Sequence, residues 1–186
     1  MTGPTSVEEV RTLARRGRRL KFVLFWKPRL RGERVSEAVL SQWERSPFTL
    51  DGRRFPTAEH YLMWRKAVLF GDGAVAERIL DAPGPAAVKA LGRQVRGFDP
   101  QVWERDRVGI SVAGNVAKFR QNPELGDYLV GTGSRILVEA SPADRIWGIG
   151  LAADDPGAEK PDRWRGRNLL GFALMRARNE LLDPDG

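Results

Sequence analysis

The stretch PQVWERDRVGISVAGNVAKFR, residues 100–120, predicts a long helix. Its apolar positions recur at the three- and four-residue spacing that brings side chains to one side of a helix. This apolar stripe is expected to face the core, and it consists of Val108, Val112, Ala113 and Val116.

Shorter helices are expected on both sides of the long one. One of them is expected to run from Ala58 to about Phe70, with Thr57 as its N-cap and Gly71 as its stop signal. Others are predicted at residues 74–80, 85–91 and 123–131. A final helix is expected to begin after Asn168, which would cap it, and a first helix is expected to begin at a capping box in residues 5–9.

Short strands complete the expected fold. Runs of β-favouring residues predict strands at 21–26, 48–50 and 136–138. Residues 148–167 are rich in glycine, proline and charge, which is typical of a long functional loop. The predicted fold class is α+β, a predominantly helical single domain with a few short strands.

The composition excludes several kinds of site. The 186 residues contain no cysteine and a single histidine, His60. Disulfides, thiolate zinc sites, iron–sulfur clusters and multi-histidine metal sites are therefore excluded. The net charge of +7 favours partners that carry phosphate. No signal peptide and no apolar run of roughly 18 residues is present, so the sequence predicts a cytoplasmic protein that does not enter a membrane.

The N-terminal residues are strongly basic. Arginines occupy positions 15, 16, 18 and 19, and residues 1–20 are expected to form a basic extension before a domain of residues 21–183. Arg15, Arg16, Arg18 and Arg19 are either solvated surface or a contact to DNA phosphates.

Two constellations carry candidate chemistry, and the first is Glu59 with Lys66. Seven residues separate them, which places both on one face of a helix about 10 Å apart along its axis. A lysine held against apolar neighbours such as Met63 and Trp64 loses hydration, and its neutral amine is a nucleophile. The alternative is an amphipathic helix with ordinary surface charges.

The second constellation follows the strand at 136–138. Asp144 precedes Trp147, Gly148 and Gly150, which would place a carboxylate beside a stacking platform and exposed backbone amides. Turn glycines with a core tryptophan would explain the same residues. Six tryptophans is a high number for this length, and two or three of them are expected in a pocket.

These motifs, taken in order, resemble the NADAR family, also called YbiA-like. The resemblance covers roughly residues 25–182. It rests on residues 46–48, 55–60, Lys66, 90–93, 117–119, 121–125, 129–133, 137–141, 144–150, 166–171 and 174–175.

The resemblance implies an N-glycosidase that acts on a ribose carbon bonded to an exocyclic amine. Such an aminal opens to an imine, which a neutral lysine can attack to form a Schiff base. Lys66 would be this nucleophile and Glu59 the general acid and base. Asp144 would hold sugar hydroxyls or assist proton transfer. Direct attack by water activated by a carboxylate stays open, with Lys66 then binding phosphate. Neither route requires a metal or another cofactor.

The resemblance also implies which residues hold the substrate. Gly148 and Gly150 would flank the ribose and phosphate beside Trp147, and Trp43 or Trp103 would stack on the base. The implied substrate-binding set is Trp43, Trp103, Lys118, Trp147, Gly148, Gly150 and Asn168.

Three functions remain open from the sequence. The first is an ADP-ribosyl glycohydrolase that restores guanine in DNA. The second is a damage-control hydrolase for phosphorylated ribosylaminopyrimidines of the riboflavin pathway. The third is a non-catalytic module that binds ADP-ribose or nucleic acid.

Overall fold

The structure is a computed structural model that describes residues 3–29 and 34–183. The chain divides into two compact units. The terminal unit comprises residues 1–41 and 124–186, and the central unit comprises residues 42–123.

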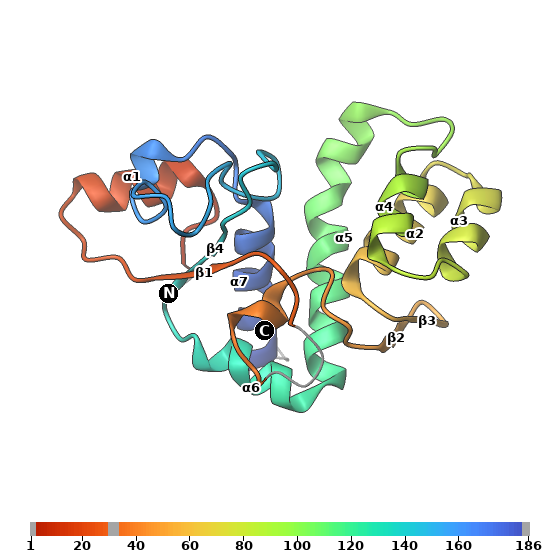
Figure 1. Ribbon diagram of the computed structural model, residues 1–186, viewed down its shortest axis with the longest axis horizontal. Coiled ribbons are helices and arrows are strands. Elements are labelled where there is room, and N and C mark those ends of the chain that lie inside the picture. The colour runs from red at the N-terminus through yellow and green to blue at the C-terminus, as the bar shows by residue number, and fades with distance from the viewer. Residues whose placement is uncertain (1–2, 30–33, 184–186) are drawn as a thin grey trace. The chain divides into compact units, whose positions relative to one another are not determined.

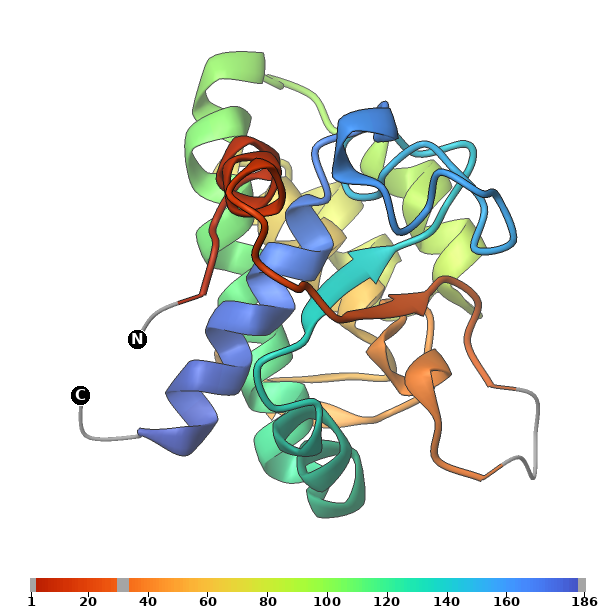
Figure 2. The ribbon, with the colours of Figure 1, turned by 90° about the vertical axis from the view of Figure 1, so that its left-hand side faces the viewer.

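The terminal unit is built around a parallel pair of strands. β1 (Phe22–Phe25) pairs with β4 (Ile136–Glu139), with Phe22 opposite Ile136. α7 (Leu169–Leu182) packs along β4, as Figures 1 and 2 show. The unit also contains α1 (Val7–Arg15), η1 (Glu37–Leu40), most of α6 (Pro123–Gly131) and η2 (Pro161–Arg163).

The central unit is a helical cluster with one hairpin. β2 (Phe48–Leu50) and β3 (Arg53–Phe55) pair antiparallel around Asp51 and Gly52. Both turn residues have positive φ, the geometry that suits a two-residue hairpin. The helices are α2 (Ala58–Leu69), α3 (Gly73–Leu80), α4 (Pro85–Gly92) and α5 (Pro100–Gln121).

Aromatic rings form the core of the central unit beneath the hairpin. The Phe55 ring lies 5.2 Å from that of Tyr61 and 5.3 Å from that of Trp64. The close packing of α5 against this cluster requires a glycine at position 114, because a Cβ there would overlap the Tyr61 ring. Trp64 is therefore a core residue.

Several boundaries match the sequence expectations. The predicted predominance of helices is confirmed, and Thr57 caps α2 by accepting a hydrogen bond from the His60 N–H. Ser6 caps α1 in the same way. Gly71 follows α2 with φ of 72°, a conformation that favours glycine. The hairpin strand β3 and the short helices η1 and η2 were not predicted.

The expected core stripe of α5 is wrong in part. Of its four residues only Val112 is buried, whereas Ala113 is exposed. Polar side chains occupy much of the buried face instead, namely Arg107, Ser111, Asn115 and Lys118. Asn115 can be buried because polar partners are supplied to it: its amide donates to the Ser111 carbonyl and accepts from Gln42. Hydrophobic periodicity does not reveal a face of this kind.

The basic N-terminal residues include a packed helix. Arg11 on α1 donates hydrogen bonds to the carbonyl oxygens of Pro161 and Trp164, at 3.1 and 3.0 Å. Arg15 forms an ion pair with Asp162 at 2.9 Å. The boundary at residue 20 between extension and domain stays a prediction.

Candidate functional site

Lys66 lies in the last turn of α2, against aromatic rings. Its Nζ is 4.2 Å from the centre of the Phe98 ring and 5.6 Å from that of Trp103. It donates a hydrogen bond of 2.7 Å to the Gly92 carbonyl. The amine is thus held in place by three contacts, all within the central unit.

The hydrogen bond to Gly92 depends on a close approach of two helices. Gly92 ends α4, and a Cβ at this position would collide with the Met63 side chain of α2. Since glycine has no side chain, the backbone of α4 comes close enough for its carbonyl to reach Lys66.

A buried carboxylate fixes the loop that carries Phe98. Asp72 accepts hydrogen bonds from the backbone N–H of Arg96 at 3.0 Å and from its guanidinium at 3.1 and 3.2 Å. These bonds hold the pKa of Asp72 well below its usual range. Gly97 follows with φ of 67°, and Phe98 then packs edge-on against Phe70 at 5.2 Å. The ring beside Lys66 is therefore held by a fixed loop, although 43% of Phe98 stays exposed.

The electrostatic consequence is a lysine that has lost water without gaining a counter-ion. Among the residues that the structure describes, no carboxylate lies within ion-pair distance of Lys66. Burial lowers the pKa of Lys66 below its ordinary value, because desolvation disfavours the charged form. The fraction of neutral amine at a given pH is correspondingly larger than for an exposed lysine.

Glu59 lies in the first turn of the same helix and is buried. Its N–H donates to the Gln42 carbonyl at 3.0 Å, and the positive end of the helix dipole favours a carboxylate here. Glu59 is not among the contacts of Lys66. The two groups share a helix, as expected, but are not in direct contact.

The other expected residues of the central unit differ in exposure. Trp103 is nearly buried and contacts Lys66, so the structure brings this pair together. Trp43 is 37% exposed, whereas Lys118 is fully buried in α5 with its Nζ 4.8 Å from the Phe119 ring. The substrate-binding role of these three residues stays a prediction.

The Asp144 loop lies in the terminal unit and holds itself together. One oxygen of Asp144 accepts hydrogen bonds from the N–H groups of Ile146 and Trp147, at 2.9 and 2.8 Å. A Cβ at Gly148 would lie 2.8 Å from the Glu139 carbonyl oxygen, and Gly150 has φ of 69°. Both glycines therefore have structural reasons to be glycine. Trp147 is half-buried.

Asn168 precedes the final helix, as expected, but its side chain bonds to β4 rather than to the first turn of that helix. It is the N-cap of α7, but its side chain makes no capping bond and its backbone is left-handed, with φ of 52°. Its amide instead donates to the Leu137 carbonyl and accepts from the Glu139 N–H, at 2.9 and 3.0 Å. Asn168 thus ties the start of α7 to β4.

Comparisons with known proteins show which family the chain belongs to. The family model described as the NADAR domain matches residues 24–182. The chain belongs to the NADAR family. That match covers both Glu59 and Lys66, and the family expected from the motifs is confirmed.

Relatives of this NADAR chain carry names that state an activity. It is 42% identical over 147 residues to "N-glycosidase R617" of Acanthamoeba polyphaga mimivirus, which covers 76% of this chain and 86% of that protein. It is 30% identical over 135 residues to "N-glycosidase YbiA" of Escherichia coli strain K12, covering 73% and 76% of the two chains. The NMR structure of that E. coli protein aligns with a TM-score of 0.70 at 26% identity, covering 88% of this chain and 86% of the other.

A third relative is part of a larger protein. The chain is 31% identical over 135 residues to "Riboflavin biosynthesis protein PYRR, chloroplastic" of Zea mays, which covers 69% of this chain and 20% of that protein. The predicted enzyme class, a hydrolase of the N-glycosidase type, is confirmed by these names together with the family match.

The sequence reasoning missed two residues that contact Lys66, Gly92 and Phe98. Gly92 was noted only as part of a family motif, and Phe98 lies in the loop before α5. A lone exposed aromatic two residues before the Pro100 that starts a helix is a weak signal. Both residues reach Lys66 through the packing of helices, which spacing along the chain does not report.

Two further observations concern the described residues 3–29 and 34–183. No helix in them is long and apolar enough to cross a membrane. No group of three or more His, Asp or Glu side chains in the same residues is arranged to hold a metal ion.

Proposed function

We propose that this chain removes ADP-ribose from guanine in DNA, through a Schiff base between Lys66 and C1′ of the ribose. The observation that carries the proposal is Lys66 itself, an amine packed on Phe98 and Trp103 with a lowered pKa. A neutral amine is what nucleophilic attack on a ribosyl imine requires.

The bonds balance without an added reactant. The sugar ring opens as the C1′–O bond breaks, which leaves an imine between C1′ and the exocyclic nitrogen of the base. The Lys66 amine adds to C1′, the guanine amine takes up a proton and leaves, and water then hydrolyses the new C1′–lysine imine. The products are ADP-ribose, DNA with an unmodified guanine, and regenerated Lys66.

Acid and base groups are needed for the proton steps. Glu59 is the proposed acid and base, since it is buried on the same helix face as Lys66. Because its carboxylate does not contact Lys66 here, the proton would pass through the substrate amine or a water. Asp144 is the proposed ligand of the sugar hydroxyls.

A second candidate has a specific observation behind it. The relative from Zea mays is named for riboflavin biosynthesis, so a phosphorylated ribosylaminopyrimidine is the alternative substrate. It contains the same bond from ribose to an exocyclic amine, and Lys66 would act identically. A module that only binds ADP-ribose is the third candidate, and catalytic turnover of either substrate would exclude it.

The test combines product release with trapping. The chain is incubated with DNA that carries ADP-ribosylated guanine, with and without borohydride, and followed by intact mass and peptide mapping. We expect ADP-ribose release and, with borohydride, an adduct on Lys66 that is absent in Lys66→Ala. Lys21→Ala is the matched control, since Lys21 is an exposed lysine of the other unit.

The outcomes separate the alternatives. Release without a trapped adduct contradicts the Schiff base and favours direct attack by water. No release from DNA, but turnover of the ribosylaminopyrimidine, moves the assignment to the second candidate. No turnover of either substrate leaves a binding module.

A further inference from the structure

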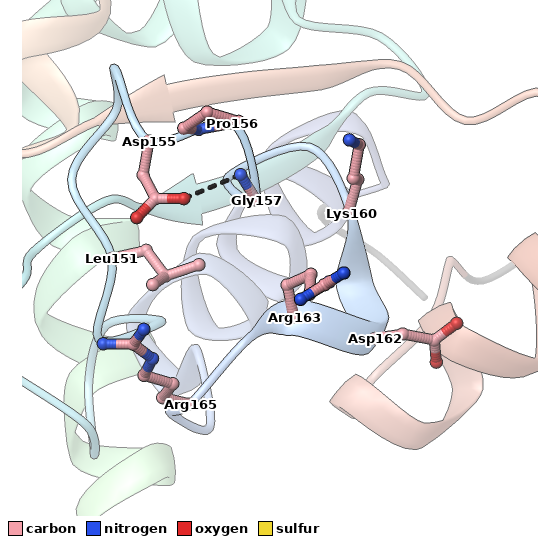
Figure 3. Close-up of a pocket in the computed structure, with 8 residues that line it drawn as sticks. All are labelled: Leu151, Asp155, Pro156, Gly157, Lys160, Asp162, Arg163 and Arg165. Atoms are coloured by element: carbon pink, nitrogen blue, oxygen red, sulfur yellow. Dashed lines mark hydrogen bonds between the residues drawn. The ribbon is translucent and has the colours of Figure 1, made fainter.

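A hollow of about 510 Å³ lies in the terminal unit. Its lining, shown in Figure 3, comes from the loop between β4 and α7. The cations in this lining are Lys160, Arg163 and Arg165, and we call them the loop cations.

The loop that carries these cations is held by its own hydrogen bonds. The N–H of Lys160 donates to the Gly157 carbonyl, and that of Arg163 donates to the Lys160 carbonyl, at 2.9 and 2.8 Å. Trp164 is buried and its indole N–H donates to the Ala158 carbonyl at 2.8 Å. The hollow is therefore part of a built structure and presents the cations at fixed backbone positions.

The acidic side chains of the hollow have partners within the described residues, whereas the loop cations do not. Asp162 forms an ion pair with Arg15 of α1, and Figure 3 shows its carboxylate turned toward that helix. Asp155 accepts the Gly157 N–H at 2.7 Å. The loop cations are exposed, and their side chains make no hydrogen bond or ion pair with the described part of the chain. The hollow thus offers positive charge to an anion from outside.

The positive surface continues beyond this hollow. A second hollow of about 480 Å³ shares Arg165 and is lined also by Arg167 and residues of α1. The ion pair between Arg15 and Asp162 places the end of α1 beside the first hollow, and exposed Arg16, Arg18 and Arg19 follow it. A row of cations across two adjoining hollows is longer than one phosphate group needs.

We propose that the loop cations bind successive phosphates of a nucleic-acid backbone, and so hold the DNA strand that carries the modified base. This inference rests on the proposed function for its biological setting but not for its test. It also revises the expected DNA contact, because Arg15 is paired with Asp162 and the loop supplies the leading cations.

The test measures binding of an unmodified single-stranded 20-nucleotide DNA to the full chain between 50 and 200 mM salt. The variant replaces all three loop cations, as Lys160→Gln, Arg163→Gln and Arg165→Gln. The matched control removes the same charge elsewhere, as Arg54→Gln, Arg120→Gln and Arg176→Gln, three exposed arginines with no side-chain partner in the described chain. Circular dichroism and thermal unfolding confirm that both triple variants are folded.

The expected result is a change in salt dependence. Three lost phosphate contacts lower the slope of log K against log salt by about 2 for a single strand. The parent chain should therefore lose roughly 20-fold more affinity than the loop variant over this fourfold rise in salt. The control variant should keep a slope close to that of the parent.

Equal slopes in the two triple variants would overturn the proposal, as would the absence of DNA binding by the parent chain. A loop variant that loses affinity for free ADP-ribose but not for DNA would assign the hollow to a small diphosphate instead. Because the DNA is unmodified, a negative result in this binding test does not contradict the proposed glycosidase activity. A chain that binds DNA but releases no ADP-ribose would contradict only the proposed function.

Discussion

The neighbourhood of Lys66 and the loop around Asp144 use polar groups in opposite ways. Lys66 has two rings and one carbonyl around it and no carboxylate within ion-pair distance in the described chain. In the loop, one Asp144 oxygen binds two N–H groups, and the Asn168 amide binds β4. The difference teaches that a motif residue can carry backbone contacts, as one oxygen of Asp144 and the Asn168 amide do, or can leave a charged group without an opposite charge among the described residues, as at Lys66.

The largest expected effect tests the functional half of this comparison. Lys66→Met keeps a similar volume but removes the amine, so we expect glycosidase turnover to fall by about 10³-fold or more. Steady-state release of ADP-ribose from modified DNA measures this. Residual activity above a tenth of the parent would contradict the assignment of Lys66 as nucleophile.

The same variant has a stability signature with a definite sign. Because the pKa of Lys66 is lowered in the folded chain, its ammonium opposes folding at pH values below that lowered pKa. This cost fades as the pH rises to the ordinary pKa of lysine. Lys66→Met should therefore unfold at the same temperature as the parent or higher at pH 7, with no advantage in strong alkali. A lower midpoint at pH 7 would indicate that the amine has a structural role.

The structural half of the comparison is tested by Gly166→Ala. A Cβ at position 166 would lie 2.8 and 2.9 Å from backbone atoms of Arg145, which cannot move aside as a side chain could. We expect a loss of about 1–3 kcal/mol in the free energy of unfolding, as for an overpacked site. Denaturant titration measures this, and an unchanged midpoint would show that the loop yields more easily than its packing suggests.

Phe98→Ala sharpens the account of Lys66. Removal of the ring lets water reach the amine, so the pKa of Lys66 should rise toward its ordinary value. Turnover at pH 7 should fall about tenfold, and the rising limb of the pH profile should move to higher pH. Trp26→Ala is the control, since Trp26 is 40% exposed in the terminal unit. A parallel loss at all pH values would mean that Phe98 acts on substrate binding rather than on Lys66.

The smallest expected effect is a gain. Gly109 is exposed within α5, and no atom lies within 4 Å of where its Cβ would be. Gly109→Ala should stabilise the chain by about 0.5–1 kcal/mol, because alanine loses less backbone entropy in a helix. Set beside Gly166→Ala in the same titration, it separates a glycine that packing requires from one that it does not. A loss of stability at Gly109 would contradict the open environment described for it.

Local signals explain why much of the fold could be predicted. The bounds of α2 depend on Thr57, whose side chain caps the helix, and on Gly71, whose positive φ ends it. The turn at Asp51 and Gly52 carries a local signal of the same kind, since both residue types accept the positive φ found there. Each of these signals acts within four residues of the chain.

The site was predictable only in part, for the same reason. Lys66 and Glu59 stand out because they share a helix, and Trp103 because of its residue type. The Gly92 carbonyl and the Phe98 ring reach Lys66 only when α4 and the following loop pack on α2. The buried polar face of α5 escaped because a hydrophobic pattern does not register hydrogen bonds such as those of Asn115 with Ser111 and Gln42.

The position of Asn168 has a consequence for how copies of this chain meet in solution. The N–H groups of Ile136 and Ala140 donate to the β1 segment, so Leu137 and Glu139 direct their backbone groups to the opposite edge of β4. On that edge the Asn168 amide occupies the Leu137 carbonyl and the Glu139 N–H, and Ile149 donates to the Glu139 carbonyl. An open strand edge is a template for aggregation. A single side chain and a loop amide therefore protect this edge from strand addition by a neighbouring molecule.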